Sequence, residues 1–173
     1  VPSQMTQTDA GERLLLFLAS DVPPFGYRAY QLQPGEAAPV RESKVRASKE
    51  VLENEFLEVR LDPRTGELTS LFDKQNQRQV LTLGQSGNQL HLLEELPRAQ
   101  RGGIPGRDTN YSVVRHVESV QVLENGPLRA AVRITRTSVS SRGKRSRYTQ
   151  DIVLTSPEPP RHPQLGRLAG GQP

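Results

Sequence analysis

The sequence contains no cysteine, no tryptophan and no long hydrophobic run. Without cysteine, a disulfide framework, a cysteine-ligated zinc site and a cysteine nucleophile are all excluded. Aromatic residues make up only 5% of the chain, so aromatic burial contributes little to any core. The longest apolar run, residues 14–19, is far shorter than a membrane span and lacks the flanks of a signal peptide. We therefore expect no membrane partner and a cytoplasmic location.

The chain is basic, with 23 lysines and arginines against 19 acidic residues in 173 positions. Its length fits one domain or a piece of a larger one. Residues 129–147 hold seven basic residues and no acid. These are Arg129, Arg133, Arg136, Arg142, Lys144, Arg145 and Arg147. Such a cluster could bind phosphate, but Tyr148 is its only aromatic neighbour, and nucleic-acid sites of this kind need stacking platforms. We expect solvated strand and turn faces, and no nucleic-acid partner.

Apolar and polar residues alternate with a period of two along nearly the whole chain, which predicts strands. The charged flanks of residues 50–53 would also suit a helical turn. The expected strands are residues 13–19, 27–32, 50–53, 56–61, 68–73, 78–81, 90–93, 113–123, 128–137 and 148–154. Residues 36–48 and 97–110 carry no period and are expected to be loops. Many short strands separated by turn residues predict an all-β fold, an antiparallel β-sandwich.

Two hairpins are the clearest local predictions. Residues 62–66, Asp-Pro-Arg-Thr-Gly, form a turn in which aspartate bonds back to the backbone, proline presets φ and glycine supplies a positive φ. Residues 124–127, Glu-Asn-Gly-Pro, are likewise expected to form a turn before the strand 128–137. In that strand one alternating set is apolar, which predicts one buried face and one basic outer face. The inward set is Leu128, Ala130, Val132 and Ile134, and the outward set is Arg129, Ala131, Arg133 and Thr135.

The residue types used in catalysis and metal binding are poorly placed along the chain. His91, His116 and His162 are far apart, and none has a metal-ligand spacing to another histidine or a carboxylate. Glu94 and Glu95 are neighbours on a strand and point to opposite faces, so they do not flank one glycosidic bond. The glycine pairs 102–103 and 170–171 match neither a P-loop nor a dinucleotide fingerprint. We predict no catalytic residue, no cofactor-binding residue and no metal ligand in this chain.

Several segments resemble a known family, in that family's order. Residues 52–59 and 61–74 resemble the hairpin that opens the large C-terminal β-domain of family 38 glycoside hydrolases, the α-mannosidases. Residues 22–27, 87–90, 118–130 and 149–152 resemble further motifs of these enzymes. The matching segments span about residues 13–156. One departure is residues 99–106, where the family has a tryptophan-rich stretch and this chain has none. A sugar-stacking platform is therefore not expected there.

The resemblance implies a fold and a place in a larger enzyme. The fold would be a galactose-mutarotase-like supersandwich, incomplete in this chain. Family members are retaining enzymes whose carboxylate nucleophile and zinc ion lie in an N-terminal catalytic domain, and none of those residues has a counterpart here. We therefore expect a fragment of an α-mannosidase-like enzyme of mannose metabolism, inactive alone and without its own cofactor. Its partner would be carbohydrate, namely mannosides, through the parent enzyme.

An alternative is a stand-alone basic β-sandwich module that binds acidic polysaccharide or nucleic acid. In the preferred interpretation, residues 1–48 are the end of a preceding β segment with a linker. Residues 49–156 are the N-terminal part of the mannosidase C-terminal β-sandwich domain. Residues 157–173 turn abruptly rich in proline and glycine, which predicts a disordered or non-native tail of a truncated or frame-shifted product. An exposed sheet edge would then favour aggregation or non-cooperative melting.

Overall fold

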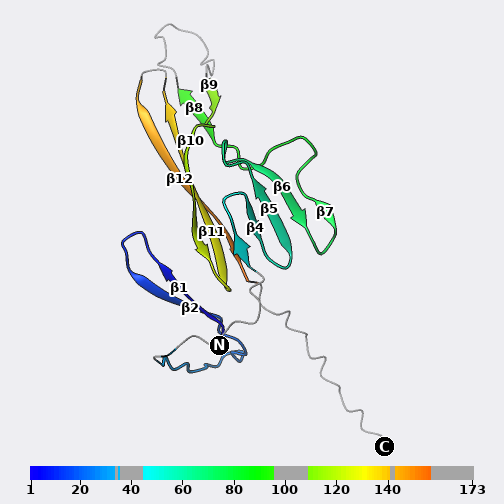
Figure 1. The fold of residues 1–173 in the computed structure, drawn as a ribbon, viewed down its shortest axis with the longest axis vertical. Coiled ribbons are helices and arrows are strands. Elements are labelled where there is room, and N and C mark those ends of the chain that lie inside the picture. The colour runs from blue at the N-terminus through cyan, green and yellow to red at the C-terminus, as the bar shows by residue number, and fades with distance from the viewer. Residues whose placement is uncertain (34, 36–44, 96–108, 141–142, 157–173) are drawn as a thin grey trace, which may run out of the picture.

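The computed structural model describes residues 1–33, 35, 45–95, 109–140 and 143–156. The described residues contain no helix, and their strands form four antiparallel sheets (Figure 1). The strands are β1 (Ser3–Gln7), β2 (Arg13–Phe17), β3 (Arg46–Ala47), β4 (Val51–Glu53), β5 (Leu57–Leu61), β6 (Leu68–Asp73), β7 (Arg78–Gln79), β8 (His91–Glu95), β9 (Thr109–Val113), β10 (Val117–Asn125), β11 (Arg129–Val139) and β12 (Arg145–Thr155). The described residues include no helix that could cross a membrane.

Two sheets enclose the hydrophobic core. One sheet has the order β3-β4-β5-β6-β7 and the other β10-β11-β12, while β1-β2 and β8-β9 form separate two-stranded sheets. Leu52, Val59 and Leu61 of the first sheet pack against Val132 and Ile134 of the second, and all five are buried. The predicted all-β sandwich class is confirmed. The core is small because each sheet contributes few large apolar side chains.

The two predicted hairpins are confirmed. Val59 of β5 lies opposite Leu71 of β6, and Gly66 in the connecting turn has a φ of 71°, the conformation that favours glycine. The Gly66 N–H donates to the carbonyl of Asp62 at 2.7 Å. In the second hairpin Val132 and Ile134 of β11 are buried as expected, but Ala131, which the alternation places on the outer face, is buried as well. Turn chemistry and period-two patterning therefore located the centre of the fold.

The strand predicted at residues 27–32 is wrong, because these residues lie in no strand. Tyr27 is 89% exposed and Leu32 75% exposed, so their apolar pattern is not matched by a burying surface. Tyr30 is held instead by local contacts. Its ring lies 5.2 Å from that of Phe17, and its hydroxyl donates to the Ser20 carbonyl at 3.0 Å. The apolar pattern of residues 27–32 is therefore typical of a strand, but these residues pair with no neighbouring strand.

Three strand boundaries also differ from the predictions. β3 occupies residues 46–47, which were expected to be loop, and its Ala47 N–H donates to Asn125 Oδ1 at 2.8 Å. β9 begins at Thr109 inside the expected loop 97–110, whose residues 97–108 lie outside the described part of the chain. The strand expected over residues 113–123 is interrupted at 114–116, where Val114 is buried and its N–H donates to the Leu90 carbonyl. Two-residue strands and interruptions carry no period, so patterning cannot find them.

β1 was not predicted at all, because its sequence is mostly polar. It pairs with β2, which was predicted, with Met5 opposite Leu15. Elsewhere the predicted strands were found with shifted ends: β7 is shorter than expected, and β8, β11 and β12 are longer. Residues 157–173 lie outside the described residues, so the nature of the tail stays a prediction.

Candidate functional site

The most distinctive side chain of the fold is a buried arginine. Arg136 continues the inward series of Val132 and Ile134 on β11, because every second residue of a strand faces the same side. It is only 1% exposed. The expectation that Arg136 belongs to a solvated strand face is therefore wrong. The signal was present in the sequence as the even-numbered alternation, but the apparent basic cluster concealed it.

The Arg136 guanidinium is surrounded by acceptors. Its Nε donates to the Thr65 carbonyl at 3.1 Å, and its Nη2 donates to the Gly66 carbonyl. Nη1 donates to Gln150 Oε1 at 3.0 Å, and Nη2 also lies 3.4 Å from the Asn88 carbonyl. Burial lowers the pKa of Arg136, and the negative charge of nearby Glu67 partly offsets this lowering. An arginine remains protonated under such a shift, so the cluster holds a buried cation shared among backbone and amide oxygens.

Asn88 and Gln150 complete this cluster. Gln150 Nε2 donates to Asn88 Oδ1 at 2.6 Å, and Asn88 Nδ2 donates to Gln150 Oε1 at 3.1 Å. Asn88 Nδ2 also lies 3.3 Å from the Gly66 carbonyl. The turn 62–66, the segment at Gly87 and Asn88, and β12 thus meet at one point. Each of these segments carries a motif of the resemblance, so the separate sequence signals converge in space.

Glu67 borders the same cluster and is 6% exposed. It accepts from Arg115 Nε at 2.9 Å. Burial acts to raise the pKa of Glu67, but hydrogen bonds from Arg115, Ser86 and Gln89 outweigh it and leave that pKa below its ordinary value. Glu67 is therefore an anion paired with Arg115 beside the buried Arg136 cation, whose own hydrogen-bond acceptors are uncharged oxygens.

A second cluster joins the ends of the two sheets. Lys74 Nζ donates to Glu53 Oε2 and to the Asn54 carbonyl, both at 2.8 Å. Asn54 Nδ2 donates to the Thr155 carbonyl of β12 at 3.1 Å, and Asn54 Oδ1 accepts from the backbone of residues 56 and 57. The hydrogen bond from Lys74, followed by that from Arg46, lowers the pKa of Glu53. These residues also belong to the resembling hairpin and link β4, β5, β6 and β12.

A third cluster fastens β1 to the β10–β11 turn. Arg129 donates from Nε and Nη2 to the Glu124 carboxylate at 2.8 and 2.6 Å. Gln4 of β1 accepts from the N–H groups of Leu128 and Arg129 and donates to Glu124 and to the Arg129 carbonyl. The same carboxylate raises the pKa of Arg129. This cluster explains why a polar strand such as β1 is ordered against the sandwich.

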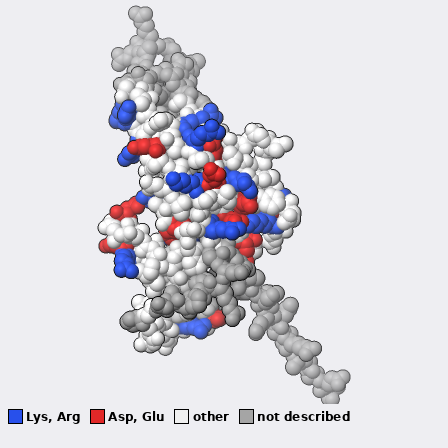
Figure 2. Space-filling view, in the orientation of Figure 1, with Lys and Arg blue, Asp and Glu red and all other residues white. Residues whose placement is uncertain are grey.

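Two of the remaining cations of residues 129–147, Arg133 and Arg147, are paired on the surface. Arg133 contacts Asp151 at 2.7 Å and Asp9 at 2.6 Å, and Arg147 contacts Glu118. These carboxylates raise the pKa values of Arg133 and Arg147. Figure 2 shows blue and red side chains interleaved over this region of the surface. Lys144 and Arg145 are exposed, and Arg142 lies outside the described residues. A sequence that looks uniformly basic therefore folds into alternating charges.

The surface pockets of the described residues include two that have charged side chains in their lining. One, of about 490 Å³, lies where β9 leads into β10 and β11 ends, and basic and hydroxyl side chains border it, including Arg115, His116, Arg145 and Ser138. The other, of about 410 Å³, lies between β1 and the β10–β11 turn and contains Gln4, Glu124 and Asn125 among its lining residues. The first pocket is therefore the more cationic of the two.

The structure separates the histidines that the sequence singled out. His91 begins β8 and is exposed, and His116 lies on the wall of the cationic pocket. Glu94 and Glu95 lie on β8, but their side chains are outside the described part, as is His162. Among the described residues, no group of three or more histidine, cysteine or acidic residues could hold a metal ion.

The family of the chain follows from its fold and its matching region. The architecture is that of an all-β, antiparallel, sandwich-like domain. The profile of the glycosyl hydrolases family 38 C-terminal domain matches residues 52–165, well over half of the chain, and the chain belongs to this family. The matched region contains β5 to β12 and the whole Arg136 cluster. It also runs past Ser156, where the domain was expected to end. A search of curated proteins finds no match to the chain.

Proposed function

We propose that this chain supplies the C-terminal β-domain of an α-mannosidase-type glycoside hydrolase and supports a catalytic domain that it does not itself contain. The observation that carries the proposal is the convergence of the family-like segments on Arg136. Thr65, Gly66, Asn88 and Gln150 all direct their polar atoms to its guanidinium rather than to a pocket. Residues used in this way hold two sheets together, which is the task of a supporting domain.

The charge state of the carboxylates supports the same proposal. Retaining glycoside hydrolysis uses two carboxyl groups about 5–5.5 Å apart, and the general acid of the pair needs a raised pKa. The pKa values of Glu53, Glu67 and Asp151 are lowered instead by basic partners. A carboxylate held ionised beside lysine or arginine is a poor proton donor at neutral pH. These groups therefore stabilise the fold rather than protonate a leaving group.

The proposal extends to cofactor, partner and location. The chain would bind no zinc of its own, since its described residues offer no ligand set of three such side chains. Mannosides would be contacted through the parent enzyme, in the cytoplasm. No nucleic acid or membrane would be a partner.

The test is an assay of the purified 173-residue chain with an aryl α-mannoside, with added zinc and with a chelator. The expected result is no turnover above the blank in either condition, while an authentic α-mannosidase is active in the same buffer. Turnover that follows the chain through two unrelated purification steps and is abolished by the chelator would overturn the proposal. Arg136→Met serves as a matched sample, because activity that is unchanged in a destabilised chain would identify a contaminant.

A second candidate function is binding of acidic polysaccharide. The cationic pocket favours it, because Arg115, His116 and Arg145 line one hollow together with three hydroxyl-bearing side chains. The test is retention on immobilised heparin, eluted with salt, for the wild type and for Arg145→Gln. Earlier elution of the variant than of an exposed control, Arg64→Gln, would support this function. Identical elution of both would exclude the pocket as the binding site.

A further inference from the structure

Among the described strands, β12 is a long strand that is paired on one side only. It forms a ladder with β11 along its whole length, and in the described part of the chain no strand lies at its other edge (Figure 1). An edge of this length presents unpaired N–H and C=O groups to any strand that approaches. Long exposed edges in natural proteins are normally covered or interrupted. We therefore expect the free edge of β12 to be covered by another strand or protected from pairing.

The hydrogen bonds at the end of β12 show which residues face that free edge. The Ser156 N–H donates to the Leu128 carbonyl, so even-numbered residues direct their backbone groups toward β11. The Thr155 carbonyl accepts from Asn54 on the opposite side. Odd-numbered residues therefore direct N–H and C=O outward, and Thr155 is already engaged. The open part of the edge runs over residues 145–153, with Thr149 at its centre.

We propose that a second copy of this chain adds its own β12 to this edge, antiparallel, with Thr149 opposite Thr149 on a two-fold axis. This register places Arg147 opposite Asp151 of the second copy, and Arg145 opposite Val153. Odd-numbered residues then form hydrogen-bonded pairs, each exchanging two backbone bonds. Cross-strand pairs of opposite charge stabilise an antiparallel sheet. The two three-stranded sheets would join into one continuous sheet.

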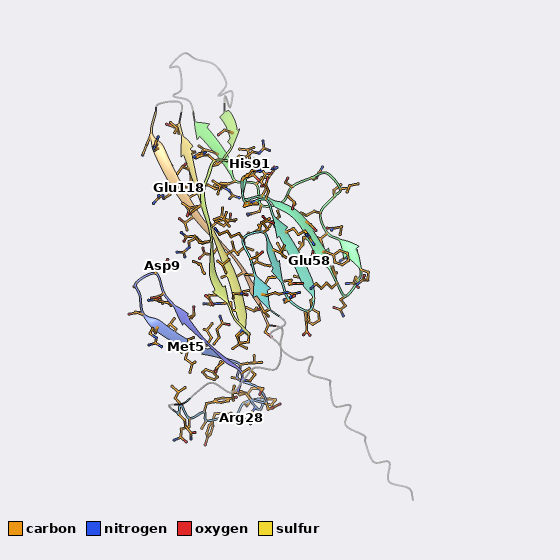
Figure 3. All side chains as sticks on the ribbon, viewed as in Figure 1. Met5, Asp9, Arg28, Glu58, His91 and Glu118 are labelled. Atoms are coloured by element: carbon orange, nitrogen blue, oxygen red, sulfur yellow. The ribbon has the colours of Figure 1, made fainter. Side chains whose placement is uncertain are left out.

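Charges on the outer face also fit this arrangement. Within one chain Glu118 pairs with Arg147, and Arg133 lies between Asp151 and Asp9. Figure 3 labels both outlying carboxylates, Asp9 at the β1–β2 turn and Glu118 on β10. Joining two chains at Thr149 extends these pairs into a row of alternating signs, from Glu118 through Arg147 to Asp151 and Arg133 of the second copy. Every charge in the row then has neighbours of opposite sign.

Registers centred on residues 147, 150 and 151, and another occupant, fit less well. A register centred on residue 150 pairs Thr155 with Arg145 of the second copy and needs the Thr155 carbonyl as an acceptor. That carbonyl already accepts a hydrogen bond from Asn54. Registers centred on Arg147 or Asp151 put like charges opposite each other, which destabilises a strand pair. Residues 157–173 include prolines at 157, 159, 160 and 163, and proline cannot donate to a ladder. The second copy is therefore the occupant that the backbone and the charges favour.

A single cysteine tests the register, because the chain has none of its own. Thr149→Cys in the full chain should form an intermolecular disulfide under mild oxidation, since hydrogen-bonded pairs have Cα atoms about 5.5 Å apart, within disulfide range. Thr69→Cys, at an exposed threonine of β6, is the matched control and should remain mostly monomeric. Equal cross-linking of the two variants would overturn the proposed register.

Light scattering tests the interface without cross-linking. The wild type should double in mass as its concentration rises, and Thr149→Pro should stay monomeric to at least tenfold higher concentration. That proline removes an outward N–H and leaves the ladder with β11 intact, so the β-sheet circular dichroism of the variant should match that of the wild type. A wild type that is monomeric throughout, or a Thr149→Pro chain that keeps its β-sheet signal and still dimerises, would overturn the proposal.

Discussion

The guanidinium of Arg136 donates to the carbonyl of Gly66, although the two residues are 70 positions apart in the chain. The contact joins the middle of one sheet to the turn of a hairpin in the other. Gly66 also leaves no space for a side chain, because a Cβ there would lie 2.6 Å from Arg136 Nη2 and 2.8 Å from Ile134 Cγ2. The arginine and the glycine therefore form one packing unit, and each restricts what the other position accepts.

Gly66→Ala should destabilise the chain by about 3 kcal/mol, because it adds a steric clash to the cost of a positive φ. The measurement is the urea midpoint followed by circular dichroism. Gly143→Ala is the matched control, with a φ of 76° and open space around the position. It should cost about 1 kcal/mol. Equal losses at the two glycines would show that the contact with Arg136 does not matter.

Acid should weaken the fold partly through Glu53. Lys74 and Arg46 lower the pKa of this carboxyl in the folded chain, whereas in the unfolded chain it is about 4.3. Its contribution is therefore complete above the unfolded pKa and is lost as pH falls through the lower, folded pKa. Glu53→Gln should lower the urea midpoint at neutral pH and flatten its decline below about pH 5.

The control for this prediction is Glu12→Gln, which removes the same charge at an exposed site. Its urea midpoint should follow that of the wild type across the pH series. A Glu53→Gln curve that runs parallel to the wild type through the acid range would contradict the assigned role of Glu53.

Patterning alone found what depends on local sequence. The turn 62–66 and the strand β11 depend on residues that are close together in the sequence, and both were correctly predicted. β1 was missed because its order depends on Gln4 bonding to a turn more than 120 positions away. The strand expected at residues 27–32 failed for the opposite reason, since a strand-like pattern needs a neighbour that the sequence does not reveal.

The seven basic residues of 129–147 should not make a nucleic-acid site. Arg129, Arg133 and Arg147 are neutralised by carboxylates, and Arg136 is buried, so few free cations remain to displace counterions. Fluorescence anisotropy with single-stranded DNA at physiological salt should show no submicromolar binding. Submicromolar binding that Lys144→Gln with Arg145→Gln abolishes would contradict this expectation.

The Arg136 cluster was predictable only in part. The even-numbered positions of β11 placed Arg136 inward, but its acceptors come from a turn, a loop segment and β12, whose meeting depends on the tertiary fold. The family-like motifs at these places are separate segments of the sequence. Their common partner, Arg136, is visible only in the folded structure, because no spacing along the chain relates residue 66 to residues 88, 136 and 150.

The family-like motifs meet at Arg136, and the stability of Arg136→Met shows whether they hold the domain together. Loss of the guanidinium removes the Arg136 donor from the Thr65 carbonyl and leaves the Gly66 carbonyl with Asn88 Nδ2 alone. It should lower the free energy of unfolding by about 3 kcal/mol in urea. Arg64→Met, at an exposed arginine of the same turn, should change it by less than about 0.5 kcal/mol. An Arg136→Met chain as stable as Arg64→Met would contradict the account.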